Sequence, residues 1–285
     1  MSLAGTTMIM SGGSRGIGEA IAVKAAADGA NVALLAKTVD PHPKLPGTIH
    51  TAAAAIEEAG GHALPLVGDV RDDAFVAEAV ARTAEQFGGI DIVVNNASAI
   101  DLSRTEDLPM KKYDLMNDIN CRGTFLLSKS CIEHLRRSSN PHILTLSPPL
   151  ELDPKWHTTF TAYTIAKFGM SLVTLGLSGE LREDGIAVNS LWPRTAIDTA
   201  AVRNVVGPGL ATSSRTPQIM ADAAYEILTR PSRELTGRFL LDDDVLEEAG
   251  VTDFSVYLNG GTDADLALDF WVEPKGVVGT GTSLA

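Results

Sequence analysis

Short apolar runs alternate along the chain with longer segments of helical periodicity. The apolar runs are Thr6–Ser11, Asn31–Ala36, Ala63–Val67, Ile90–Asn95, His142–Ser147, Ala187–Leu191 and Arg238–Leu241. The helical segments are Gly16–Asp28, Thr48–Ala59, Asp72–Phe87, Tyr113–Ser138, Thr161–Arg182 and Pro217–Thr229. Such an alternation is typical of consecutive β-α-β units, in which helices cover both faces of one parallel sheet. The sequence therefore predicts an α/β fold with a doubly wound parallel sheet.

Charge is unevenly distributed along the 285 residues, whose 36 acidic and 23 basic side chains give a net charge of −13. Residues 241–285 contain ten of the acids and one base, so residues 1–240 are nearly balanced. We expect a single domain over 1–240 and an acidic C-terminal extension over 241–285. This extension is either a solvated appendage or a segment that covers an edge of the domain. The acidic excess argues against nucleic acid as a partner, because binding to phosphates needs clustered Lys and Arg.

Cysteine use and apolar content favour a cytoplasmic protein. The two cysteines, Cys121 and Cys131, have neither the spacing of a disulfide framework nor that of a metal site, so we expect no metal. The apolar stretch near Met1 is too short for a signal peptide, and no window approaches the roughly 20 apolar residues of a membrane span.

A glycine-rich turn joins the first apolar run to the first helical segment. It places Gly12, Gly16 and Gly18 in a Gly-x-x-x-Gly-x-Gly pattern, with Ser14, Arg15 and Ile17 between them. Glycines at such a turn let the backbone approach a pyrophosphate, which the free N–H groups of the following helix stabilise. The pattern is a variant of the Rossmann dinucleotide fingerprint, and the alternative is a plain tight turn.

The charge after the second strand indicates which dinucleotide binds. An NAD site usually has a carboxylate there for the ribose 2′-OH, whereas a 2′-phosphate needs a cation. Here the strand runs into Lys37, with no acid before Asp40, and Arg15 lies in the glycine-rich turn. NADP(H) is therefore the predicted cofactor, and the alternative is that both cations are solvated surface charges.

Two polar turns follow later strands at the same edge. Asp69 and Val70 follow the third strand, where the carboxylate can approach the adenine amino group. Asn96 and Ala97 follow the fourth, where small side chains let a bound ring lie against the backbone. Each of these segments can also be an ordinary turn.

Tyr163 and Lys167 form the strongest chemical signal. Residues four apart share one face of a helix, so the ammonium of Lys167 can lie beside the phenol of Tyr163. A cation about 5 Å away favours the phenolate by about 3 kcal/mol at an effective dielectric constant of about 20. We therefore expect a lowered Tyr163 pKa and a tyrosine that acts as an acid and base.

Together these motifs resemble the short-chain dehydrogenase/reductase family from residue 5 to about 240. The matching residues are the three glycines of the turn, Asp69, Asn95-Asn96-Ala97, Asn120, Ser147, Tyr163 and Lys167. The resemblance implies that Tyr163 passes a proton to or from the substrate oxygen, which Ser147 hydrogen-bonds. It also implies that Lys167 binds the cofactor ribose and tunes Tyr163, while Asn120 holds a water that connects Lys167 to solvent.

Three segments resemble, more closely, the hydroxysteroid dehydrogenase-like protein 2 group of this family. They are Ala36–Leu45, Leu146–Leu150 and Leu191–Ile197, and the last contains Pro193 and Thr195, for which the resemblance implies cofactor contacts. The group implies an NADP-dependent oxidoreductase. Its animal members add a C-terminal sterol-carrier domain, which we expect this chain to lack.

Several residues depart from the family pattern. Ser147 is followed by two prolines and precedes Tyr163 by more residues than usual, and Arg194 stands where a glycine is usual. One hypothesis is that Arg194 clamps an anionic substrate group, and the alternative is that it pairs with an acid such as Asp198. Trp156 either lines an apolar substrate pocket or serves packing.

These observations predict an NADP(H)-dependent oxidoreductase that interconverts a carbonyl and a secondary alcohol. The small-molecule substrate is expected to be a lipid-like, steroid-like or acidic ketone. The resemblance also implies a homodimer or homotetramer, because the 113–138 and 161–182 helices commonly pair between subunits in the family. The alternative is a non-catalytic NADP-binding or lipid-handling protein on the same fold.

Overall fold

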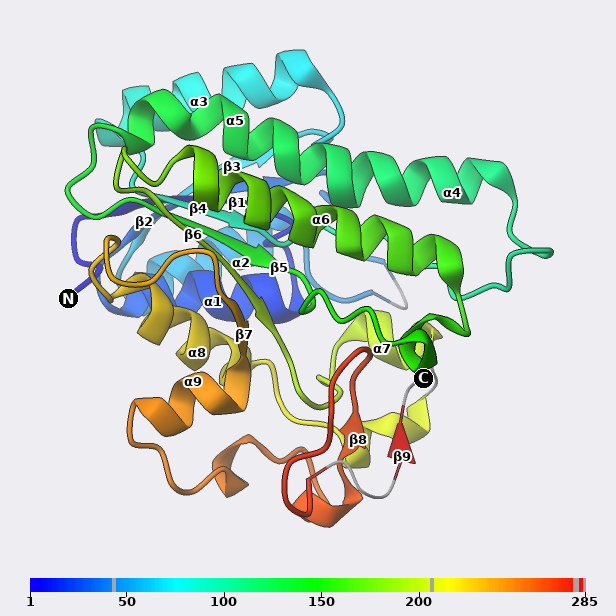
Figure 1. The fold of residues 1–285 in the computed structure, drawn as a ribbon. Coiled ribbons are helices and arrows are strands. Elements are labelled where there is room, and N and C mark those ends of the chain that lie inside the picture. The colour runs from blue at the N-terminus through cyan, green and yellow to red at the C-terminus, as the bar shows by residue number, and fades with distance from the viewer. Residues whose placement is uncertain (43–44, 206–207, 279–281, 284–285) are drawn as a thin grey trace.

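The computed structural model describes residues 1–42, 45–205, 208–278 and 282–283, and its centre is one parallel sheet. Seven strands lie in the order β3-β2-β1-β4-β5-β6-β7, and every pairing between them is parallel (Figure 1). The strands are β1 (Thr7–Ser11), β2 (Asn31–Ala36), β3 (His62–Val67), β4 (Ile92–Asn95), β5 (His142–Leu146), β6 (Ala187–Trp192) and β7 (Phe239–Leu241). The predicted doubly wound sheet is confirmed.

Helices cover both faces of the sheet (Figure 1). One face carries α1 (Gly16–Ala27), α2 (Ile49–Ala59), α8 (Gln218–Leu228) and α9 (Asp242–Glu248). The other carries α3 (Asp73–Phe87), α5 (Gly123–Leu135) and α6 (Thr161–Glu180), with α4 (Met110–Asn117) leading into α5. Each layer packs its own apolar cluster against the strands, because a strand buried on both sides needs apolar cover on both. None of the described helices is both long and apolar enough to cross a membrane.

Capping and glycine signals explain where several helices begin and end. The Thr48 hydroxyl accepts a hydrogen bond from the Thr51 N–H at the start of α2, and the Asp72 carboxylate does the same for Ala74 and Phe75 at the start of α3. Gly60 and Gly88 end these two helices with positive φ angles of 105° and 87°. Such caps satisfy N–H and C=O groups that a helix end leaves free.

The predicted single helix over Tyr113–Ser138 is wrong in one respect. A π-helical turn, Asp118–Arg122, separates α4 from α5. Such turns widen the helix locally, and this one contains the buried side chain of Asn120. The short helix α7 (Ala200–Val205) and α9 were not predicted either.

The strand order reverses between β1 and β4, so a crevice opens at the carboxyl ends of the strands. Open α/β sheets bind ligands at this kind of reversal. The glycine-rich turn after β1, the Asn96 turn after β4 and the loop after β6 all meet there. In the loop Asp40–Gly47, Pro43 and Lys44 lie outside the described residues.

The acidic segment 241–285 packs onto the domain as far as it is described, so the solvated appendage is the wrong alternative. Val245 and Leu246 of α9 belong to the apolar cluster of their sheet face. Farther along, Phe270, Trp271 and Val272 are buried beside the start of α6. A small parallel pair, β8 (Ala267–Leu268) with β9 (Thr282–Ser283), lies in this segment.

Arg194 joins this segment to the end of β6. Its side chain is 7% exposed, and its Nε donates to Asp243 at 2.6 Å. Its Nη2 donates to Asp244 at 2.8 Å, and its Nη1 donates to the Glu273 carbonyl at 3.0 Å. These partners use the guanidinium that the sequence hypothesis assigned to an anionic substrate. Arg194 therefore forms ion pairs and is not a substrate clamp. Its partners are Asp243 and Asp244 of α9 and not Asp198, which pairs with Arg203.

Replacing Arg194 should destabilise the whole domain. Arg194→Ala leaves the buried Asp243 carboxylate without its cation, so we expect the free energy of unfolding to fall by about 3 kcal/mol. Chemical denaturation measures this loss. Arg82→Ala, which removes an exposed pair with Glu78, should cost less than about 0.5 kcal/mol. Equal losses in the two variants would contradict a structural role for the Arg194 cluster.

Candidate active site

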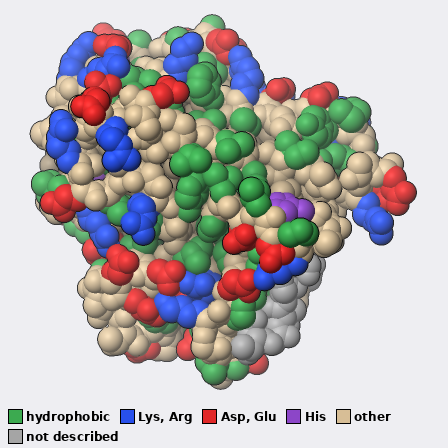
Figure 2. Space-filling view, in the orientation of Figure 1, with side chains coloured by type: hydrophobic (Ala, Val, Ile, Leu, Met, Phe, Trp, Pro, Cys, Tyr) green, Lys and Arg blue, Asp and Glu red, His purple; other side chains and the backbone are tan. Residues whose placement is uncertain are grey.

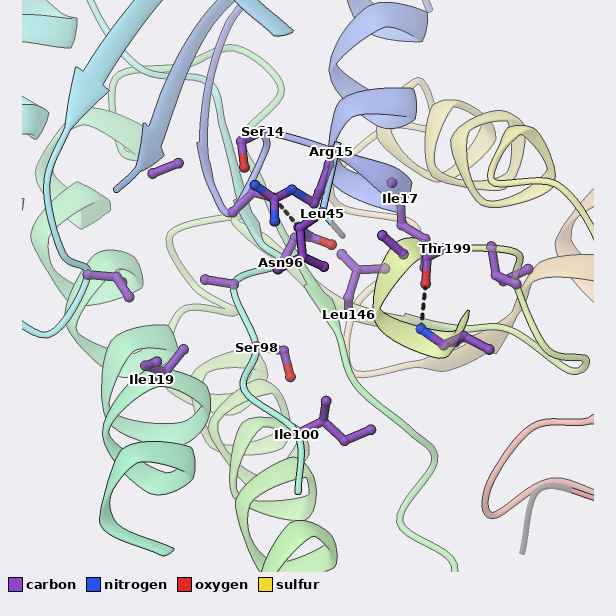
Figure 3. Close-up of a pocket in the computed structure, with 18 of the residues that line it drawn as sticks. Ser14, Arg15, Ile17, Leu45, Asn96, Ser98, Ile100, Ile119, Leu146 and Thr199 are labelled. Carbon is purple, nitrogen blue, oxygen red and sulfur yellow. Dashed lines mark hydrogen bonds between the residues drawn. The ribbon is translucent and has the colours of Figure 1, made fainter. Parts of the chain in front are cut away.

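A cavity of about 470 Å³ lies at the carboxyl ends of the strands. Figure 3 shows Ser14 and Arg15 at one end of it and Ser98 and Ile100 at the other. Most of the residues singled out in the sequence line it: Gly12, Ser14, Arg15, Gly16, Ile17, Lys37, Asp69, Val70, Asn96, Ala97, Tyr163, Lys167 and Pro193. Gly18, Asn120, Ser147, Trp156, Arg194 and Thr195 are not among the lining residues.

The glycines of the turn lie in close contact with the loop after β4. Gly12 has a φ of 76°, and a Cβ there would lie 2.7 Å from the Ala97 Cα. A Cβ on Gly18 would lie 2.5 Å from the Asn96 amide nitrogen, which donates to the Gly12 carbonyl at 2.7 Å. Gly18 therefore lets α1 pack against the loop after β4, although it does not line the cavity.

The start of α1 is suited to an anion. Its N-cap residue, Arg15, makes no side-chain capping bond, in contrast to the caps of α2 and α3. The Arg15 Nη2 donates to the Gly47 carbonyl at 2.9 Å, and the buried Nε has no partner among the described residues. Free helix N–H groups and an unpaired guanidinium donor fit the phosphates of a dinucleotide.

Lys37 and Asp69 line the cavity after β2 and β3. The Lys37 side chain is 63% exposed, and its Nζ is 3.6 Å from the Asp69 carboxylate. Arg71 donates two hydrogen bonds to that carboxylate, from Nε at 3.0 Å and from Nη2 at 2.7 Å. These bonds are the main reason why the Asp69 pKa falls to about 2. Arg71 was not predicted, since a base two residues after an acid in a turn is not distinctive in sequence.

Tyr163 and Lys167 lie one turn apart near the start of α6, and both are buried and line the cavity. The Lys167 Nζ donates to the Leu146 carbonyl at 2.6 Å and lies 4.8 Å from the centre of the Trp192 ring. Burial lowers the Lys167 pKa to about 7.

The expected lowering of the Tyr163 pKa is not observed. Burial of the phenol raises the Tyr163 pKa well above its ordinary value, and the carboxylate of Asp269 raises it further. Desolvation of the phenol is the largest of these effects, and it outweighs the lowering that the ion-pair argument predicts. At neutral pH the phenol is therefore protonated.

The other two predicted catalytic residues lie behind the cavity wall. Ser147 follows β5, its side chain is fully buried, and its Oγ has no partner among the described residues. The Asn120 Oδ1 accepts from the Ala99 N–H at 2.7 Å, and its Nδ2 donates to the Ala99 carbonyl at 3.1 Å. Asn120 thereby holds the loop after β4 against the π-helical turn.

Aromatic side chains from the C-terminal segment cover Tyr163. Its ring centre lies 6.2 Å from that of Phe270 and 5.7 Å from that of Trp271. Trp271 has a φ of 62°, an unusual backbone conformation for a bulky residue. Trp156 packs on the margin of the same aromatic cluster and does not line the cavity.

Sequence reasoning missed two parts of the cavity wall. Asp269 and Phe270 come from the segment expected to be an extension, and no motif marks them. Ile197 and Thr199 come from the loop after β6 and Val202 from α7, and none of the three was singled out as a site residue. In that loop the Thr199 hydroxyl accepts from the Val202 N–H at 3.3 Å (Figure 3). Thr195 is buried nearby, and its hydroxyl has no partner among the described residues.

The chain is similar in sequence to a known enzyme family. The family model described as short chain dehydrogenase matches residues 6–207. Hydroxysteroid dehydrogenase-like protein 2 is 59% identical in Danio rerio and 53% identical in Homo sapiens, in each case over 90% of this chain. The chain spans about three-fifths of the length of these relatives, 61% and 60% respectively.

Two solved structures have closely similar folds. A short chain dehydrogenase from Mycobacterium thermoresistibile is 59% identical, with a TM-score of 0.91 over 98% of this chain and 100% of that one. A putative dehydrogenase from Xanthomonas campestris is 52% identical, also with a TM-score of 0.91, over 96% of this chain and 100% of that one. With its parallel sheet, glycine-rich turn and Tyr163/Lys167 pair, this chain belongs to the short chain dehydrogenase family, whose members are oxidoreductases that bind a nicotinamide cofactor.

Proposed function

We propose that the chain is an NADP(H)-dependent oxidoreductase that interconverts a ketone and a secondary alcohol. The observation that carries the proposal is that one cavity joins the glycine-rich turn to the Tyr163/Lys167 pair. A nicotinamide supplies a hydride to the carbonyl carbon or accepts one from the alcohol. In reduction Tyr163 donates its phenolic proton to the substrate oxygen, and in oxidation the phenolate takes that proton back.

The neighbours of Tyr163 support this role. A charged Lys167 stabilises the phenolate that proton donation leaves behind. We assign to Ser147, whose buried hydroxyl has no partner among the described residues, the role of a second hydrogen-bond donor to the substrate oxygen. We assign to Asn120 the role of holding the loop that contains Ala99 in place.

Local charge favours NADP(H) over NAD(H). Arg15 and Lys37 are cations that line the cavity after β1 and β2. The nearest acid at that end, Asp69, is already bonded to Arg71. A ribose 2′-phosphate therefore finds two cations and a carboxylate whose charge is compensated.

The substrate side of Tyr163 favours a neutral, apolar ketone. Phe160, Phe270 and Trp271 surround the phenol ring, and Arg194 is engaged in its own ion pairs. The buried carboxyl of Asp269 would repel an anionic group. Of the substrates expected from the sequence, a lipid-like or steroid-like ketone fits this surface better than an acidic one.

A non-catalytic NADP-binding or lipid-handling protein is the second candidate. The observation that favours it is the aromatic cover, since the side chain of Tyr163 is only 5% exposed. This candidate binds cofactor without reducing any ketone, which distinguishes it from the first.

We also propose a homodimer or homotetramer that pairs through α5 and α6. Figure 2 shows hydrophobic side chains gathered over α6, where Ile165, Leu172 and Leu175 are exposed, with Phe125 exposed on α5. A cytoplasmic location stays a prediction of the sequence.

Removal of the Tyr163 hydroxyl tests the proposed reaction. Wild type and Tyr163→Phe are incubated with NADPH and a panel of steroid, fatty and simple ketones, and oxidation of NADPH is followed by its absorbance. We expect kcat to fall by at least about 10²-fold in the variant, because it lacks the proton donor, while NADPH binding stays within about threefold. Turnover that persists in Tyr163→Phe would contradict the proposed mechanism. NADPH binding without turnover in wild type would favour the non-catalytic candidate.

Removal of the Lys37 ammonium tests the cofactor preference. In Lys37→Ala we expect the ratio of kcat/KM with NADPH to that with NADH to fall by about tenfold, since a charge-assisted contact to the 2′-phosphate is lost. Lys111→Ala, an exposed lysine in α4, is the matched control and should leave the ratio unchanged. An unchanged ratio in Lys37→Ala would exclude Lys37 from phosphate recognition.

A further inference from the structure

Asp269 is a buried acid in the cavity that the mechanism above does not use. It lies beyond residues 6–207, which match the family model, and its side chain is 7% exposed. It lines the same cavity as Tyr163 and Lys167. Burial of a carboxylate costs free energy unless the group is paired or hydrogen-bonded, so its neighbours indicate what it does.

The backbone around Asp269 holds the carboxyl in place. The Asp269 N–H donates to the Arg194 carbonyl at 2.9 Å, and the Trp192 indole donates to the Phe270 carbonyl at 3.0 Å. The Asp269 Oδ1 accepts from the Phe270 N–H at 2.7 Å. Among the described residues no hydrogen-bond donor reaches the other carboxyl oxygen. That oxygen can therefore interact with groups that line the cavity.

The charges around Asp269 come from two helices. Lys167 and Tyr163 of α6 both interact with it electrostatically, and Asp242 of α9 repels it. Burial raises the Asp269 pKa to about 7 and lowers the Lys167 pKa to about 7, while each group favours the charged form of the other. Asp269 is the acid that favours the Lys167 ammonium, and it also favours the protonated phenol.

We propose that Asp269, which lines the same cavity, is a positioning residue of the catalytic centre that keeps Lys167 charged in the resting protein. The Lys167 ammonium is the group that stabilises the phenolate formed when Tyr163 gives its proton to a ketone. The role in turnover rests on the proposed function, but the effect on the charge of Lys167 does not. The C-terminal segment thereby takes part in the chemistry of the site that it covers.

The test measures the titration of Lys167 directly. Protein labelled with ¹³C at lysine Cε is titrated by NMR, and Lys167→Met identifies the resonance. Asp269→Asn keeps an oxygen for the Phe270 N–H but removes the charge, so we expect the Lys167 midpoint to fall by about one pH unit from its wild-type value near 7. Asp269→Glu keeps the charge and should return the midpoint to within about half a pH unit of wild type.

Asp265→Asn is the matched control, because Asp265 lies four residues earlier in the same segment but bonds to Thr262 outside the cavity. It should leave the midpoint unchanged. The inference is overturned if Asp269→Asn leaves the Lys167 midpoint unchanged, or if Asp265→Asn shifts it equally. If Asp269→Asn does not fold, Asp269→Ser serves with the same expected shift.

Activity gives a separate reading. In ketone reduction the alkaline limb of the kcat/KM profile should move to lower pH in Asp269→Asn by the same amount as the NMR midpoint, because loss of the Lys167 proton ends activity. A limb that stays in place while the midpoint moves would overturn the role of Asp269 in turnover. If wild type reduces no ketone, the proposed function fails, and the NMR titration alone then decides the effect of Asp269 on Lys167.

Discussion

The buried ion cluster of Arg194 is the interaction on which the catalytic end of the molecule depends. Its guanidinium binds two acids of α9 and the backbone of residue 273, so three distant parts of the chain meet at the end of β6. A buried cation without these partners would be strongly destabilising. The same backbone that positions Arg194 accepts the N–H of Asp269, so the cluster also determines where the C-terminal segment crosses the cavity.

This crossing explains the electrostatics of the site. A Tyr/Lys pair on an open sheet edge would be hydrated, and the lysine would lower the pKa of the phenol. Under Phe270 and Trp271 both groups lose water, so the phenol keeps its proton and the ammonium becomes easy to deprotonate. An additional carboxylate is one physical means of restoring the charge of a buried lysine, and Asp269 lies where it has that effect.

Local sequence signals predicted the sheet and most of the cavity. Strands that alternate with helices leave few topologies. The glycines at 12 and 18 are explained by close approaches that a Cβ would block, and Gly16 by its φ of 59°. The Lys37 and Tyr163/Lys167 positions follow from strand ends and helical spacing, which are also local. The pKa of Tyr163 could not be predicted in this way, because it depends on burial by residues about 100 positions later in the chain.

The parts that were missed depend on long-range contacts. The sequence offered Asp198 as a partner for Arg194 because it is near in the chain, whereas the true partners lie about 50 residues away. Asp269 looked like one acid among ten in a charged tail, and only the fold separates it from the exposed ones. The π-helical turn at Asn120 interrupts a segment whose periodicity is that of a continuous helix.

Hydride transfer to a ketone is the central claim, and isotope transfer tests it most directly. Wild-type protein is incubated with a ketone and NADPH carrying deuterium at both C4 positions, and the alcohol is analysed by mass spectrometry. The account predicts one deuterium on the carbinol carbon of the product. Alcohol without deuterium, or bound cofactor with no alcohol from any ketone of the panel, would contradict it.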